Sequence, residues 1–147
     1  MNRRHSIVAA IAAAVVVALA PSGAAQNQEK YKARLATVPM DGGMRDAVAG
    51  TGSVAAVLTG TRLTINGTFA GLRSPATTAR LHGGVATGVR GASLAELTVS
   101  KATDGAITGA IDLAPEQVQS LQKGRLYIQV SSEKAPDGNL WGWLLRR

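Results

Sequence analysis

The sequence predicts an all-β domain, either an immunoglobulin-like β-sandwich or a Greek-key barrel, with one short crossover helix. Two observations predict this class. Apolar and polar residues alternate with a period of two along most of the chain, as they do in strands that bury one face. The alternating segments are short and closely spaced, with Gly, Pro, Asp and Asn between them, which is typical of sandwiches and barrels.

A charged and then apolar segment precedes this domain. Residues 1–5 carry positive charge, residues 7–20 are all apolar, and small residues follow up to Ala25. Because the apolar run is shorter than the roughly 20 residues that span a bilayer, we expect residues 1–25 to be a cleavable signal peptide. An uncleaved anchor helix is the weaker interpretation, since Pro21 breaks a helix there. The Arg3–Arg4 pair leaves the twin-arginine export route open.

Residues 26–147 are then expected to form a single exported domain, in the periplasm or outside the cell. It would meet a membrane only through the signal peptide before cleavage. The domain has no cysteine, so it must rest on its hydrophobic core instead of disulfides. The same lack of cysteine excludes thiol redox chemistry, covalent haem attachment, and cysteine-ligated zinc or iron–sulfur sites.

The alternation predicts about eight strands. In chain order they cover residues 31–37, 48–58, 62–69, 76–82, 94–99, 106–113, 126–132 and 140–145. Pro39 ends the first one, because proline cannot donate to a strand ladder. The Asn66–Gly67 pair in the third segment is a common hairpin turn. The alternation nevertheless continues through this pair without a change of phase, which favours one continuous strand.

One segment, residues 115–123, breaks the period of two and fits a short helix. Val118 and Leu121 have helical spacing, Pro115 suits a first helical turn, and Gly124 suits the end. Because this segment lies between two predicted strands, we expect it to be a crossover connection.

The chain is basic, with a formal net charge of +7 at pH 7. Its Lys and Arg residues are scattered along the sequence, without a basic stripe or interleaved aromatic residues. Nucleic acid binding is therefore not expected. Weak attraction to an anionic envelope surface stays open.

No catalytic or metal site is predicted. His82 is the one histidine after the signal peptide, and its neighbours in sequence supply no further ligands for a metal, while Arg80 would repel a cation. No serine lies in a Gly-x-Ser-x-Gly motif, and the acidic residues are spread over loops and strand ends. We expect no enzyme and no cofactor, and we interpret His82 as a hydrogen-bonded structural histidine.

Trp141 and Trp143 form the most informative pair in the chain. Two residues apart on a strand, they share one face. Either they cover one end of the core, or they present an amphipathic patch to a partner. Gly142 between them leaves the opposite face bare and allows close approach of another backbone. We take Trp141, Trp143 and His82 as the candidate partner surface.

Nearly the whole domain, residues 30–145, resembles the CHRD domain, a module first named from chordin and also found singly in exported bacterial proteins. The similar segments follow in the family's order at residues 67–72, 78–84, 109–113, 115–117, 124–130 and 135–143. The resemblance implies an immunoglobulin-like β-sandwich and, for bacterial members, an uncharacterised role. Where the family usually has His-x-His this chain has Arg80 and His82, and where it often has a further histidine this chain has Ser131. The resemblance therefore implies that any imidazole cluster is dismantled here.

Together these observations predict a non-catalytic binding or structural module of the cell envelope. Its partner would be an unknown protein or envelope component. The alternative hypothesis is a small metal-binding protein with a degenerate histidine site at His82.

Overall fold

The computed structural model describes residues 27–147, so the expected signal peptide at residues 1–25 lies outside the described residues. The elements are β1 (Gln28–Thr37), the 3-10 helix η1 (Gly42–Met44), β2 (Thr51–Thr59), β3 (Arg62–Ala70), β4 (Ala76–Gly83), β5 (Ala92–Val99), β6 (Gly105–Asp112), α1 (Pro115–Gln122), β7 (Leu126–Ser132), β8 (Ala135–Trp143) and β9 (Leu145–Arg146). Within this range no helix is long and apolar enough to cross a membrane.

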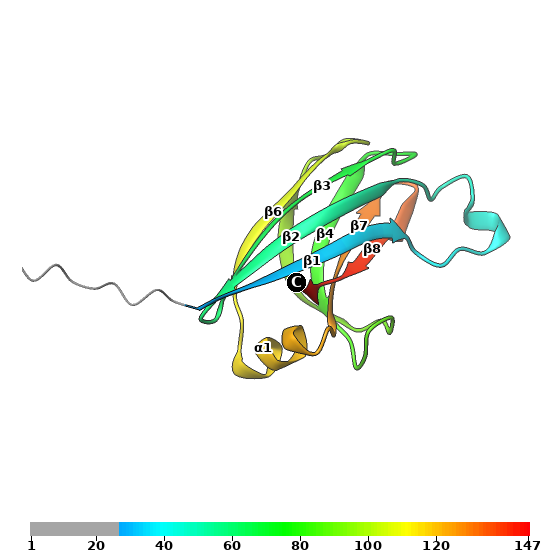
Figure 1. Ribbon diagram of the computed structural model, residues 1–147. Coiled ribbons are helices and arrows are strands. Elements are labelled where there is room, and N and C mark those ends of the chain that lie inside the picture. The colour runs from blue at the N-terminus through cyan, green and yellow to red at the C-terminus, as the bar shows by residue number, and fades with distance from the viewer. Residues whose placement is uncertain (1–26) are drawn as a thin grey trace, which may run out of the picture.

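Strands β1 to β8 form a closed antiparallel barrel (Figure 1). Their order around the barrel is β1, β2, β3, β6, β5, β4, β7 and β8, and β1 pairs with both β2 and β8 to close it. Because β4, β5 and β6 are consecutive neighbours and β3 lies beside β6, the order contains a Greek key. The all-β class is confirmed. Of the two architectures that the sequence left open, the structure has the barrel, and the immunoglobulin-like sandwich is not confirmed.

Strand β3 is continuous through Asn66 and Gly67, which pair with Ala55 and Val54 of β2. The predicted continuous strand is therefore confirmed, and the hairpin alternative is wrong. The second strand begins at Thr51 and not at residue 48. The reason is that Val48 donates its N–H to the Met44 carbonyl in the turn after η1 and packs in a small apolar cluster away from the barrel interior.

The last predicted strand, residues 140–145, differs most from the structure. Strand β8 begins earlier, at Ala135, because a tight turn after Ser132 brings Ala135 opposite that residue in β7. The strand ends at Trp143, and one further hydrogen bond, from the Leu144 N–H to the Leu126 carbonyl, continues its register with β7. The chain then continues as β9, which pairs with β1.

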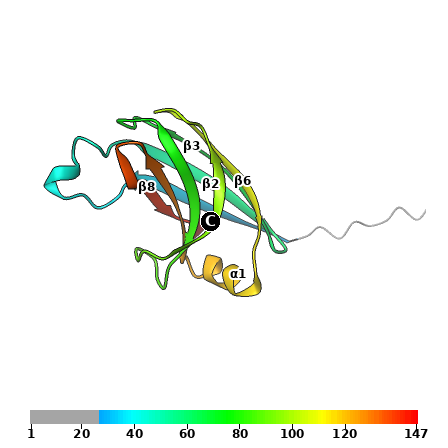
Figure 2. The ribbon, with the colours of Figure 1, turned by 180° about the vertical axis from the view of Figure 1, so that it is seen from behind.

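Helix α1 is confirmed, and it crosses between β6 and β7, which are not neighbours in the barrel. The Gln117 side chain accepts a hydrogen bond from the Ala114 N–H at 2.9 Å, which satisfies a backbone donor at the start of the helix. Leu121 is fully buried. The helix therefore covers one end of the barrel, and the loop with η1 projects from the other end (Figures 1 and 2).

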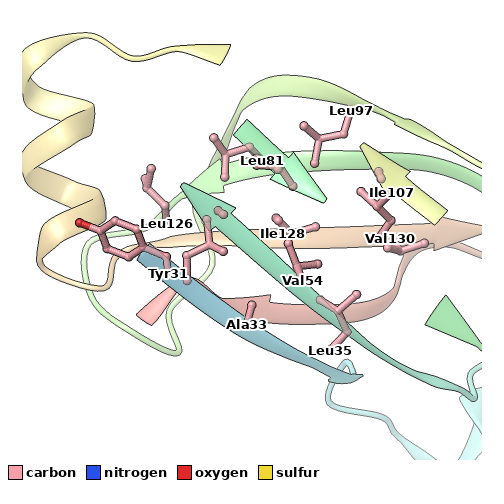
Figure 3. Close-up of a cluster of buried hydrophobic side chains, with 14 of the residues drawn as sticks. Tyr31, Ala33, Leu35, Val54, Leu81, Leu97, Ile107, Leu126, Ile128 and Val130 are labelled. Atoms are coloured by element: carbon pink, nitrogen blue, oxygen red, sulfur yellow. The ribbon is translucent and has the colours of Figure 1, made fainter. Parts of the chain in front are cut away.

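Inward-facing residues at alternate strand positions fill the barrel. On β1 these are Tyr31, Ala33 and Leu35, and Figure 3 shows them lined up along the strand, with Tyr31 beside α1. Gly142 of β8 also faces inward, and a Cβ there would meet the Arg34 carbonyl oxygen of β1. The close backbone approach expected at Gly142 is confirmed, and it lies where the barrel closes.

Candidate functional site

Four aromatic rings meet on the outer face of β4, β7 and β8. The strand register places His82 opposite Tyr127, and Tyr127 opposite Trp143. Trp141 lies two residues before Trp143 and therefore on the same face of β8. We call His82, Tyr127, Trp141 and Trp143 the aromatic cluster.

The rings of the aromatic cluster are in contact. His82 stacks on Tyr127 with ring centroids 4.9 Å apart, and Tyr127 lies 4.8 Å from Trp143. The two Trp rings meet edge to face at 4.6 Å. Contacts in these geometries each stabilise by about 0.5–1.5 kcal/mol beyond burial of area. Tyr127 is the centre of the cluster, because it contacts all three other rings and is only 1% exposed.

The loop between β4 and β5, residues 84–91, folds back over this cluster. The Tyr127 hydroxyl accepts a hydrogen bond from the Gly91 N–H at 3.0 Å and donates to the Gly91 carbonyl at 3.2 Å. His82 Nδ1 lies 3.1 Å from the same carbonyl, so Nδ1 carries the proton and donates. Thr87 donates to the Gly124 carbonyl at 2.7 Å. The loop is thus fixed at its end by the Tyr127 and His82 side chains beneath it, and at its middle by its own Thr87 side chain.

The two Trp side chains are half-buried and have different neighbours. Trp141 packs against the small apolar cluster of Val38, Val48 and Ala135, and the Arg90 guanidinium lies 5.1 Å from its ring centroid. Trp143 has its indole Nε1–H buried, and in the part of the chain that the structure describes this donor makes no hydrogen bond. A buried donor without a partner costs roughly 1–3 kcal/mol, so the arrangement is not optimised for stability alone.

The three residues predicted as a partner surface are therefore brought together. Neither Trp belongs to the main core inside the barrel, and Trp141 packs on the second, smaller cluster. Tyr127, which joins them, was missed as a site residue. Its place in the alternation of β7 indicates that it lies opposite in face to Leu126 and Ile128, but the cross-strand register that sets it between His82 and Trp143 cannot be read from one strand.

His82 is engaged by its stacking on Tyr127 and its hydrogen bond to Gly91. Among residues 27–147, no three His, Cys, Asp or Glu residues come close enough together to hold a metal ion. No observation of the described chain therefore favours the metal-binding alternative.

A polar cluster at the α1 end has a structural role. The Tyr31 hydroxyl donates to Glu29 at 2.5 Å, and Arg146 forms an ion pair with Glu29 at 3.2 Å. The hydrogen bond from Tyr31 holds the pKa of Glu29 below its ordinary value, with a further contribution from Gln122 of α1 and from Arg146. Burial and the nearby Glu29 raise the pKa of Tyr31. The cluster ties β1, β9 and α1 together.

The comparison with protein families gives one match. The family model described as CHRD domain matches residues 31–144, which is most of the chain and includes the whole aromatic cluster. No curated protein matches the chain, and no solved structure matches it.

Proposed function

The chain belongs to the CHRD domain family, and from this premise we propose that it is a non-catalytic, exported binding module of the cell envelope. Its binding site is the aromatic cluster, together with Arg90 above it. Its partner is a protein or another component of the envelope.

The observation that carries this proposal is the pair of half-buried Trp rings on the outside of the barrel. Outward strand positions on a barrel are normally polar, and large rings there cost solubility. Trp, Tyr and Arg are also the residues most enriched where binding energy concentrates. Here Tyr127 contacts both Trp rings, and Arg90 lies over the ring of Trp141.

The surroundings of the aromatic cluster support a contact surface. Val85 and Val89 of the covering loop are exposed, Val85 by 75%. Leu145 is also exposed, and it lies beside Gly124 together with Thr87 of the loop. On the other side, Gln129 and Arg80 continue the cross-strand row of Trp141. An apolar patch with a polar border is the usual anatomy of a recognition surface.

The proposal of a non-catalytic role rests on what the cluster contains. Its one imidazole, that of His82, is held in place by stacking on Tyr127 and by the hydrogen bond from Nδ1 to the Gly91 carbonyl. The four residues of the cluster include no carboxylate to act as its acid–base partner, and the indole donor and the guanidinium bind and orient a ligand.

Both Trp residues of the chain lie in the aromatic cluster, so the Trp fluorescence of this chain reports on this site. Fractions of envelope extract are titrated onto residues 26–147 while Trp emission is recorded. We expect a saturable change in emission from the fraction that holds the partner, and affinity capture from the same fraction then isolates it.

Variants decide the result of the capture. W141A/W143A is expected to lose the partner, while M40A keeps it, because Met40 is an apolar side chain 45% exposed outside the cluster. Circular dichroism and urea unfolding establish that both variants are folded. Equal capture by a folded W141A/W143A variant would overturn the proposal.

A further inference from the structure

A second feature of the outer surface lies on β1, the strand that pairs with β8 beside the aromatic cluster. Lys30, Lys32 and Arg34 are all exposed, and they alternate with the buried Tyr31, Ala33 and Leu35. A strand advances about 3.3 Å per residue, and alternate residues share a face, so neighbouring cations in this line are about 6–7 Å apart. The charges are scattered along the sequence, but the alternation of side chains in β1 places three of them in a row on its outer face.

Two shallow hollows lie along this row. One, of about 600 Å³, is lined by Lys32 and Arg34 of β1 together with residues of β2 and β3. The other, of about 300 Å³, is lined by Lys30 and Lys32 together with residues of β2 and by Arg147. The hollows share Lys32 and Ser53, so they adjoin. We call the two hollows together the β1–β2 furrow.

The furrow is open because β2 and β3 present small side chains to it. The register places Ala55 opposite Lys32 and Ser53 opposite Arg34, so β2 puts no large side chain beside either cation. On the other side of β1, Leu145 of β9 lies opposite Lys32. Thr51, Ser53 and Thr68 line the first hollow with hydroxyl groups. Such groups donate and accept hydrogen bonds to sugar hydroxyls and carboxylates.

The charge of the furrow is not compensated by acidic residues in its lining. Neither hollow is lined by Asp or Glu. Glu29, the neighbour of Lys30, is engaged by Tyr31, Arg146 and Gln122. The Arg147 N–H donates to the Lys30 carbonyl at 3.0 Å, which brings a further cation to the end of the row.

We propose that the β1–β2 furrow binds an acidic polysaccharide, a linear chain of sugars that carry carboxylates. An elongated furrow with cations in a row complements a linear polyanion. A single-stranded nucleic acid would need exposed rings for base stacking. The two aromatic residues in the lining, Tyr31 and Phe69, are both buried. A lipid surface would favour large apolar side chains that insert into it, and the exposed lining residues include none.

The test uses polygalacturonate as the acidic polysaccharide and neutral dextran as its uncharged counterpart. Residues 26–147 are titrated by calorimetry at low salt and again at physiological salt. We expect binding to polygalacturonate that weakens with salt, and no binding to dextran. K32Q/R34Q is expected to weaken binding about tenfold, since it removes two exposed ion pairs with the carboxylates of the ligand.

The matched control is K123Q/K134Q, which removes the same charge from two exposed lysines outside the furrow. This variant is expected to bind within about twofold of the wild type, because it alters net charge alone. An equal loss in both variants, or no binding to polygalacturonate, would overturn the proposal. Tighter binding to oligo-dT or to phosphatidylglycerol vesicles, lost in K32Q/R34Q, would overturn it in favour of another class of ligand.

The furrow and the aromatic cluster are separate claims. W141A/W143A is expected to bind polygalacturonate as the wild type does, and K32Q/R34Q is expected to capture the partner of the aromatic cluster. Trp emission is the fold control for K32Q/R34Q, since both Trp residues lie outside the furrow.

Discussion

The outer faces of β8 and β1 are neighbours in one barrel, yet they carry opposite kinds of surface. On β8 and β7, rings pack on rings and a loop is bonded over them, so the side chains are half-buried or buried. On β1, three cations are exposed to solvent, and the residues that β2 places beside Lys32 and Arg34 are small. The difference shows that alternation decides only which side chains point outward. What covers them decides whether they stabilise the fold or stay available for a ligand.

The largest effect is expected from removing the centre of the aromatic cluster. Tyr127→Ala should lower the free energy of unfolding by about 3–5 kcal/mol, because it empties a buried site and frees the loop at Gly91. Tyr127→Phe keeps the ring and should cost about 1 kcal/mol for the lost hydrogen bonds. Urea unfolding measures both. A cost below about 1 kcal/mol for Tyr127→Ala would mean that the outer face of β7 is as independent of the fold as β1.

The second effect concerns the contact between β8 and β1 that closes the barrel. Gly142→Val should lower the free energy of unfolding by about 1–3 kcal/mol or more, since its Cβ meets backbone of β1 at Arg34. Gly42→Ala is the control, because a Cβ at Gly42 meets nothing within 4 Å, and its cost should stay within about 0.5 kcal/mol. Equal costs for the two variants would contradict a barrel closed by contact of β8 with β1.

The third effect is a pH dependence at the start of β1. The pKa of Glu29 is lowered in the folded protein, chiefly by the hydrogen bond from Tyr31. Its contribution to stability is therefore present above its ordinary value of 4.5 and is lost as the pH falls through the lowered pKa. Urea unfolding at neutral pH and well below pH 4.5 should show a smaller pH-induced loss in Glu29→Gln than in the wild type. The same loss in both proteins would mean that other carboxylates cause it.

The smallest effect is expected on the outer face of β1. K32Q/R34Q should change the free energy of unfolding by no more than about 0.5 kcal/mol, because both side chains are exposed and make no ion pair in the described chain. Thermal unfolding checks it. A larger loss of unfolding free energy would show that the cations of β1 stabilise the fold. That result would contradict the difference between β1 and Tyr127.

The sequence predicted most of the strands because their alternation reports burial directly. It also predicted α1, since Pro115 and Gly124 mark its two ends and Leu121, which is buried, has the spacing of a helix. The last strand was placed wrongly, because Pro136, Asp137 and Gly138 have the composition of a turn. The strand nevertheless begins at Ala135, opposite Ser132, and the register with β7 shifts before it resumes at Leu140 opposite Val130. Gly138, within this irregular stretch, has a φ of 133°.

The candidate site was predicted in part, for a different reason. Trp141 and Trp143 could be assigned to one face by their spacing, and His82 stood out as a lone histidine. That the three meet depends on the order of β4, β7 and β8 in the barrel, and on the register that inserts Tyr127 between them. Neither order nor register has a local signal. The row of cations on β1 was not predicted as a site either, because the hollows beside it form only in the folded barrel.

The central claim is that the aromatic cluster is where the partner binds. It is tested most directly by photo-crosslinking in the cells that produce the protein, with p-benzoylphenylalanine placed at Val89, in the exposed loop over the cluster, or at Thr108, exposed on β6. We predict a discrete crosslinked product from Val89 and none of that mass from Thr108. The same product from both positions, or from Thr108 alone, would contradict the claim.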